Sequence, residues 1–211
     1  MVGSVLRMGR SFPNLLPPRR RLTLISTSAV VDYAEKVRQL VRPDRYAHIL
    51  RVAELATQIA KANALDEGKA YLAAILHDAA RDLSDERLQE LAPPENEIER
   101  NHPLALHGRA GRRLAQEWGV KDEEVLEAIE GHVYGVSPDH KIAMALYVAD
   151  VSEPGRGVNH EIREMALSGR LEEAYQKAVI CKVRHLQQKG IEPHPRTWAA
   201  YQALQRHRNV E

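Results

Sequence analysis

The apolar side chains between residues 43 and 63 recur with the spacing of an α-helix. They stand one, three or four residues apart, at Ile49, Val52, Ala53, Ala56, Ile59 and Ala60. Because one helical turn takes 3.6 residues, these positions form one face of a long amphipathic helix. The next segment, about 67–80, is apolar nearly all round, which is typical of a helix deep inside a bundle.

Capping and helix-breaking residues divide the rest of the chain. The predicted helices cover approximately residues 84–92, 103–118, 122–132, 138–151, 159–167 and 170–188. We expect a loop from Pro93 to Asn101, because two consecutive prolines stop a helix. A segment over 193–204 follows the last helix, and no segment favours a strand.

Composition supports an all-α fold. Aromatic residues make up 5% of the chain and hydrophobic residues 44%, and an alanine- and leucine-rich composition suits helix-on-helix packing better than β-sheets. A length of 211 residues favours one domain. We therefore predict a single-domain helical bundle over residues 32–205, with a short tail at 206–211.

Residues 1–31 differ from the rest. They contain five arginines and three prolines but no acidic residue. They lack the compact apolar core and the cleavage site of a secretory signal. We expect a disordered basic leader or an over-long predicted start, and contact of this leader with RNA is an alternative.

Charge and cysteine content exclude several classes of protein. Lysine plus arginine total 30 and aspartate plus glutamate 29, so there is no basic excess typical of a nucleic-acid or anionic-membrane binder. No apolar stretch reaches the ~18 to 20 residues of a transmembrane helix. The single cysteine, Cys181, allows neither an internal disulfide nor a thiolate metal cluster. We expect a cytoplasmic protein whose metal ligands are imidazoles and carboxylates.

Six histidines and aspartates on or at the ends of predicted helices are candidates for a metal site: His48, His77, Asp78, His107, His132 and Asp150. Neighbouring helical residues point ~100° apart, so the His77-Asp78 pair can flank one cation. The dipeptide alone is weak evidence in a chain with ten histidines. Asp150 strengthens it, because a carboxylate ending the apolar run 143–149 must be paired, hydrogen-bonded or metal-bound.

The surroundings of these residues resemble a known family. The matching segments are Arg45-Tyr46-Ala47-His48, Leu76-His77-Asp78-Ala79-Ala80-Arg81, Leu106-His107-Gly108, Ala128-Ile129-Glu130-Gly131-His132, and the run from Tyr147 to Arg156. They are similar to the YqeK family of HD-domain phosphohydrolases, which cleaves dinucleoside tetraphosphates symmetrically. The resemblance extends over about 32–205. This chain departs from it at Arg81, Val133 and Ser152, where the family usually has lysine, threonine and isoleucine.

The resemblance implies a metal-dependent hydrolase with the HD-domain fold. It implies iron at His48, His77, Asp78 and Asp150, although histidine and carboxylate ligands also suit manganese, cobalt, nickel or zinc. His107 and His132 would bind a second metal or contact phosphate. Catalytic roles fall to Asp78 and Arg81, with hydroxide on the metal as the expected nucleophile. The expected substrate-binding residues are Arg45, Val133, Arg156 and Arg196.

Two other functions stay open at this point. One is a different HD chemistry: a nucleoside monophosphate phosphatase, a cyclic phosphodiesterase or a guanosine polyphosphate hydrolase. The other is a non-catalytic nucleotide sensor that keeps the same pocket. For partners we expect a nucleotide substrate, no membrane and no firm nucleic-acid partner, and we leave a homodimer open.

Overall fold

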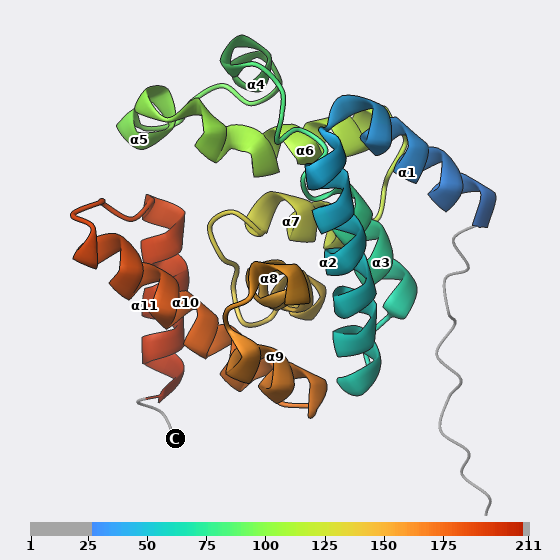
Figure 1. Cartoon of the computed structure of the whole chain (residues 1–211). Helices are drawn as coiled ribbons and strands as arrows, with labels where there is room; N and C mark the ends of the chain where they lie inside the picture. Colours follow the sequence, from blue (N-terminus) through green and yellow to red (C-terminus); the bar gives the residue numbers. More distant parts are fainter. Residues whose placement is uncertain (1–26, 209–211) are drawn as a thin grey trace, which may run out of the picture.

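The computed structural model describes residues 27–208, and within that range it contains helices and no strand (Figure 1). The all-α prediction is confirmed. The elements are α1 (Thr27–Leu40), α2 (Pro43–Ala62), α3 (Glu67–Leu76), α4 (Asp85–Leu91), α5 (Glu97–Asn101), η1 (Pro103–Leu106), α6 (His107–Glu117), α7 (Glu123–Gly131), α8 (Lys141–Ser152), η2 (Pro154–Arg156), α9 (His160–Leu167), α10 (Leu171–Gln188) and α11 (Pro195–Arg208).

Helix α8 forms the centre of the bundle. Every side chain from Ile142 to Ala149 is buried, and the helix packs against α2, α7, α9 and α10 (Figure 1). An all-round apolar helix can be buried only when neighbours cover each of its faces. Its C-terminal end therefore brings Asp150 to a point where the ends of several surrounding helices meet.

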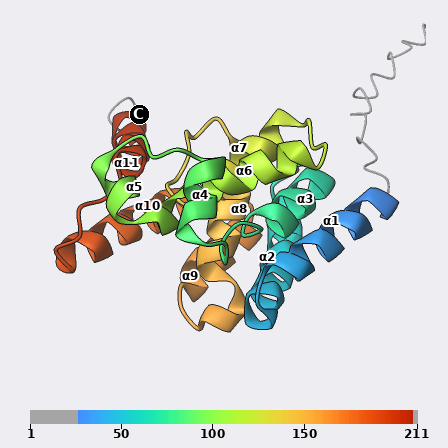
Figure 2. The same cartoon turned by 90° about the horizontal axis from the view of Figure 1, so that it is seen from above.

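A smaller layer covers one end of the bundle. Helices α4 and α5 lie in front of the main bundle when it is viewed from above, and α6 leads back into it (Figure 2). This layer has its own apolar cluster, which includes Leu88, Leu106 and Leu114. It positions η1 and therefore the first residue of α6, His107.

Several helix ends agree with the predicted caps. The side chain of Ser84 accepts a hydrogen bond from the backbone N–H of Arg87, and that of Asp122 accepts one from Val125, at 3.3 and 3.2 Å. Such bonds satisfy backbone donors that the first helical turn leaves free. These caps fix the starts of α4 and α7.

Three boundaries were predicted wrongly. The expected loop from 93 to 101 contains α5, because Asn96 caps it by accepting a hydrogen bond from the N–H of Glu99 at 3.0 Å. The helix expected from 138 begins only at Lys141, after a turn in which the N–H of His140 bonds to the carbonyl of Ser137. Helix α3 ends at Leu76, so His77 and Asp78 lie in the turn that follows it.

The termini extend the helical region beyond the expected domain. Helix α1 begins at residue 27, before the boundary expected at 32, and α11 runs to residue 208, beyond 205. The remainder of the expected leader, 1–26, lies outside the described residues. No helix within 27–208 is long and apolar enough to cross a membrane.

Candidate metal centre and active site

The structure brings all six candidate histidines and aspartates into one group, here called the His/Asp cluster: His48 on α2, His77 and Asp78 after α3, His107 at the start of α6, His132 after α7 and Asp150 on α8. All are buried except Asp150, which is slightly more open. Residues separated by about a hundred positions thus meet because helix ends converge at one place.

The ligand atoms of this cluster are spaced as one or two cations require. The Nε2 atom of His48 lies 3.1 Å from Asp150 Oδ1, and that of His77 lies 3.9 Å from the same oxygen and 3.5 Å from Asp78 Oδ2. Two ligands about 2.1 Å from one ion are about 3 to 4 Å apart. In two overlapping sets the ligand atoms all lie within 4.8 Å of one another: His48 with His77 and Asp150, and His77 with Asp78 and His132.

In three of the histidine rings, a backbone carbonyl determines which ring nitrogen is left with a lone pair for a metal. The Nδ1 atoms of His77, His107 and His132 donate to the carbonyls of Ala74, Leu104 and Ile129 at 2.7, 2.6 and 2.7 Å. A carbonyl oxygen can only accept, so each Nδ1 carries the hydrogen and each Nε2 presents a lone pair. Burial lowers the pKa of His77 to about 4 and also lowers that of His107, which keeps both rings neutral at pH 7.

A carboxylate performs the same function for His48. Its Nδ1 donates to Glu153 Oε1 at 3.1 Å, and Glu153 is itself buried, with Arg51 donating to both of its oxygens at 2.8 and 3.1 Å. Burial lowers the pKa of His48, but the nearby carboxylates of Asp150 and Glu153 outweigh this effect and raise the pKa. No sequence pattern pointed to this role of Glu153, because Glu153 and His48 are 105 positions apart.

The free nitrogens show that the cluster is built for a cation. Within the described residues, the buried Nε2 atoms of His48 and His77 have no hydrogen-bond partner. The 3.1 Å approach of His48 Nε2 to Asp150 Oδ1 is within bonding range, yet its direction is not that of a hydrogen bond. This arrangement is expected when two ligand atoms point at a common centre.

The second pair of histidines leads to the same conclusion. The Nε2 atoms of His107 and His132 face each other at 3.0 Å, although both present lone pairs. Asp78 Oδ1 lies 3.4 and 3.5 Å from them. Two lone pairs repel at this distance unless a positive charge lies beside them. The donor set of imidazole and carboxylate therefore fits a divalent metal of the iron, manganese, cobalt, nickel or zinc type.

Asp78 and Asp150 are held as carboxylates. Burial raises the pKa of each, but in the acid range where these carboxyl groups titrate, the neighbouring protonated histidines outweigh it, with the charge of His77 foremost for Asp78 and the contact with His48 foremost for Asp150. The pKa of each carboxyl group therefore lies below its usual range. Both can act as charged ligands at any physiological pH.

Two of the predicted substrate-binding arginines lie beside these carboxylates. Arg45 donates to Asp78 Oδ2 at 3.0 Å, and Arg156 donates to Asp150 Oδ1 at 2.5 Å. Arg156 thus pairs with Asp150, and Glu153 pairs with Arg51. Asp82, the acidic residue next to Arg81, accepts a hydrogen bond from the backbone N–H of Arg42 at 2.9 Å. Arg81 itself is half-buried. Burial lowers its pKa, and the negative charges of Asp78 and Asp150 oppose this effect in part.

The other two predicted substrate-binding residues have different surroundings. The carbonyl of Val133 accepts a hydrogen bond from Lys182. Arg196 pairs with Glu130 and, at 3.1 Å, with Glu95, and its guanidinium lies 5.6 Å from the centre of the Tyr134 ring. Arg196 is therefore bonded to carboxylates outside the His/Asp cluster, and its contact with substrate stays a prediction.

Comparison with known proteins identifies the family. Residues 45–155 match the HD domain family, a range that contains the whole His/Asp cluster. The chain is 31% identical over 175 residues to the symmetrical bis(5'-nucleosyl)-tetraphosphatase of Bacillus subtilis (strain 168), which covers 80% of this chain and 93% of that protein. The chain belongs to this HD-domain family. It is an HD-type, metal-dependent phosphohydrolase, as the sequence motifs predicted.

Other relatives support the same family assignment. A protein of the same name from Staphylococcus aureus (strain NCTC 8325 / PS 47) is 35% identical, with 77% of this chain and 90% of that one covered. The chain spans only 42% of a Mycoplasma genitalium relative, a probable nicotinate-nucleotide adenylyltransferase/Ap4A hydrolase, at 37% identity. A crystal structure of a predicted HD superfamily hydrolase involved in NAD metabolism from Clostridium acetobutylicum superimposes with a TM-score of 0.78 at 29% identity, covering 84% of this chain and 97% of that chain.

Proposed function

We propose that this HD-domain protein hydrolyses dinucleoside tetraphosphates symmetrically and releases two molecules of ADP from diadenosine tetraphosphate. The observation that supports this proposal most is the convergence of four imidazole lone pairs and two carboxylates at one buried point with arginines beside it. The names of the Bacillus and Staphylococcus relatives support the choice of substrate.

His48, His77, Asp78 and Asp150 would hold the metal, with iron as the first choice. When bound, a divalent cation lowers the pKa of water and neutralises charge on a phosphate. His107 and His132 would hold a second cation or contact phosphate. The two oxygens of Asp78 support the two-cation alternative, because Oδ2 faces His77 while Oδ1 faces His107 and His132.

The chain's own residues would orient the phosphate chain and stabilise its charge. Arg45 and Arg156 each use part of a five-donor guanidinium on a cluster carboxylate, which leaves further N–H groups for phosphate oxygens. Arg81 would add a third charge. In the reaction, the oxygen of water would bond to one of the two central phosphorus atoms, and the bond from that phosphorus to the oxygen that bridges the two would break. The bridging oxygen leaves with one ADP, the water oxygen stays on the other ADP, and a proton of water is released to solvent.

A substrate panel tests this proposal against the other HD chemistries. Anaerobically purified protein is incubated with Fe(II) or Mn(II) and, separately, diadenosine tetraphosphate, nucleoside monophosphates, cyclic nucleotides and guanosine polyphosphates. We expect ADP from the first substrate and turnover of it that exceeds the others. Faster release of phosphate from a monophosphate would favour the phosphatase, and binding of nucleotide without turnover of any substrate would favour the sensor.

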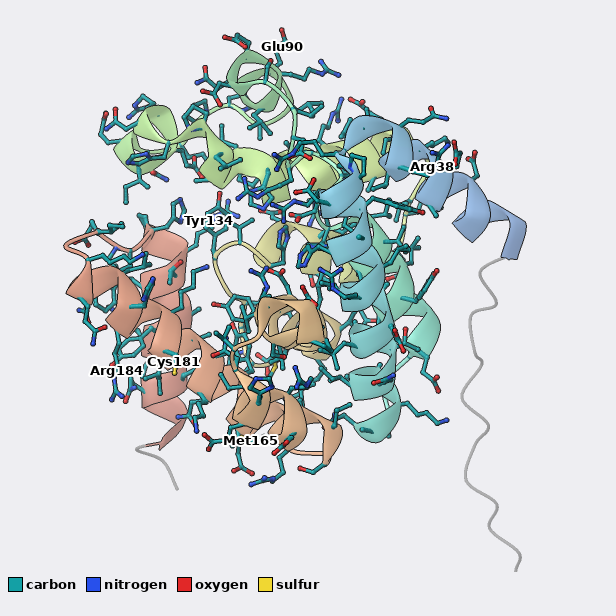
Figure 3. All side chains as sticks on the ribbon, in the orientation of Figure 1. Arg38, Glu90, Tyr134, Met165, Cys181 and Arg184 are labelled. Carbon is teal, nitrogen blue, oxygen red and sulfur yellow. The ribbon has the colours of Figure 1, made fainter. Side chains whose placement is uncertain are left out.

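Two finer properties stay predictions. A cytoplasmic location rests on the single cysteine, and Cys181 is exposed on α10 (Figure 3). A homodimer stays open and can be tested by light scattering.

A further inference from the structure

Lys182, on α10, directs its ammonium group between two segments that carry members of the His/Asp cluster. Its Nζ donates a hydrogen bond to the carbonyl of Val133, the residue after His132. The same Nζ lies 5.5 Å from the centre of the Tyr147 ring, and Tyr147 precedes Asp150 by about one turn of α8. Helix α10 packs against α8 (Figure 1), so the ammonium lies beside residues that neighbour the cluster in sequence.

The surroundings of this ammonium provide few partners. A lysine has three N–H donors, and within residues 27–208 the acceptor that it bonds is the neutral Val133 carbonyl. Burial lowers the pKa of Lys182 to about 8, while the negative charge of Asp150 favours the protonated form. Among the described residues the buried hydroxyl of the neighbouring Tyr147 also has no hydrogen-bond partner. Burying polar groups in this way is unfavourable unless a further partner arrives.

The charges of the cluster indicate which partner is missing. Its two carboxylates are already paired with Arg45 and Arg156, and they would also neutralise a bound cation. Neither then provides a full negative charge to Lys182. An incoming phosphate chain would provide that negative charge to Lys182. The arginines would contact the same phosphate chain from α2 and from the segments after α3 and α8.

We propose that Lys182 is a further phosphate-binding residue, which supplies a positive charge from α10 to the phosphate chain held at the His/Asp cluster. The ligand class in this inference rests on the proposed function. The ammonium would keep its bond to Val133 and donate a second hydrogen bond to a phosphate oxygen. Lys182 would thereby fix the chain on the side opposite the arginines.

Substitution of Lys182 by methionine tests the inference, because it keeps the aliphatic stem and removes the charge. The probe is ADP, titrated by calorimetry into metal-free and Mn(II)-loaded protein. We expect ADP binding to weaken roughly 10- to 100-fold, the factor for loss of a hydrogen bond to a charged group. The melting temperature should stay unchanged or rise, since a poorly partnered, partly buried charge is removed. Lys177→Met is the matched control, because Lys177 is on the same helix and pairs with Glu161 at the surface.

ADP affinity within twofold of wild type in folded Lys182→Met would overturn the inference. So would a weakening that comes with a lower melting temperature and loss of Mn(II) binding, since that pattern indicates a structural role. If Lys182→Met does not fold, Lys182→Gln replaces it, because the amide can keep a hydrogen bond to Val133. Wild-type ADP binding in that variant would also overturn it. Lys182-dependent ADP binding without hydrolysis of diadenosine tetraphosphate would refute the proposed function and leave this inference standing.

Discussion

Glu153 orients His48, and replacing it by glutamine should weaken metal binding. The carboxylate accepts hydrogen bonds from His48 Nδ1, from two nitrogens of Arg51 and, at 2.5 Å, from the N–H of Gly155. A glutamine can still accept from His48 with its oxygen. Its NH2 group then faces the donors of Arg51 and Gly155, so the side chain must rotate or leave donors unpaired.

The size of this effect can be derived from the role of Glu153, which is hydrogen-bonded to the candidate metal ligand His48. Loss of a residue that orients a metal-binding histidine typically costs about 10- to 100-fold in metal affinity or activity. We expect Glu153→Gln to fall in this range and to regain most of its rate at saturating Mn(II), because the ligands themselves remain. Affinity is measured by titrating Mn(II) into metal-free protein. Glu161→Gln, an exposed carboxylate on α9, is the control.

Unchanged Mn(II) affinity in Glu153→Gln would refute the reasoning. It would show that the ring of His48 is held in place by packing alone. A lower rate that saturating metal does not restore would also contradict it, because Glu153 would then act on the substrate.

Three further predictions concern stability. Glu99→Ala should destabilise the protein by about 3 to 5 kcal/mol, because this fully buried carboxylate pairs with Arg109 and His194 at 3.0 and 3.2 Å. Urea unfolding measures the change, and substitution of the exposed Glu97 by alanine should alter the unfolding free energy by less than about 0.5 kcal/mol. Gly108→Ala should destabilise by about 1 to 3 kcal/mol in the same assay, because a Cβ there would lie 2.6 Å from the carbonyl of Glu130, and a wild-type midpoint would contradict this contact. The metal-free protein should lose stability as pH falls from about 6.5 toward about 4. The reason is that His77 takes up a proton at about 4 when folded and near 6.5 when unfolded, so the unfolded state binds more protons within that window. This group contributes a loss of up to about 3 kcal/mol, and His77→Gln should flatten the dependence of the unfolding free energy on pH; an unchanged slope would be the contrary result.

The sequence predicted the helices well because they depend on local patterns, and the six candidate ligands that it singled out come together in the structure. The spacing of apolar residues in α2 and the all-round apolar run of α8 are visible without a structure. The ligand residues stand at the ends of such runs. Helix α5 was missed because its cap, Asn96, follows two prolines, and a polar segment of five helical residues has little periodicity.

Contacts between distant residues could not be predicted in this way. Glu153 bonds to His48 across 105 positions, and Lys182 bonds to the carbonyl of Val133 across 49. Tyr134 lies between the layer of α4 and α5 and the C-terminal helices (Figure 3), with its hydroxyl 3.2 Å from Glu99. Such partners depend on how helices pack, which a single sequence does not give. A charged residue within an otherwise apolar helix face, such as Lys182 on α10, is the kind of signal that could have pointed to one.

We propose that the His/Asp cluster catalyses hydrolysis of diadenosine tetraphosphate at a central phosphorus. The most direct measurement is ion-exchange and mass analysis of products formed in ¹⁸O-labelled water, with Fe(II), beside Asp78→Asn and the surface control Lys177→Met. We expect two ADP per substrate, one of them carrying a single ¹⁸O, with no product from Asp78→Asn and wild-type product from the control. Formation of ATP and AMP, or full activity in Asp78→Asn, would contradict it.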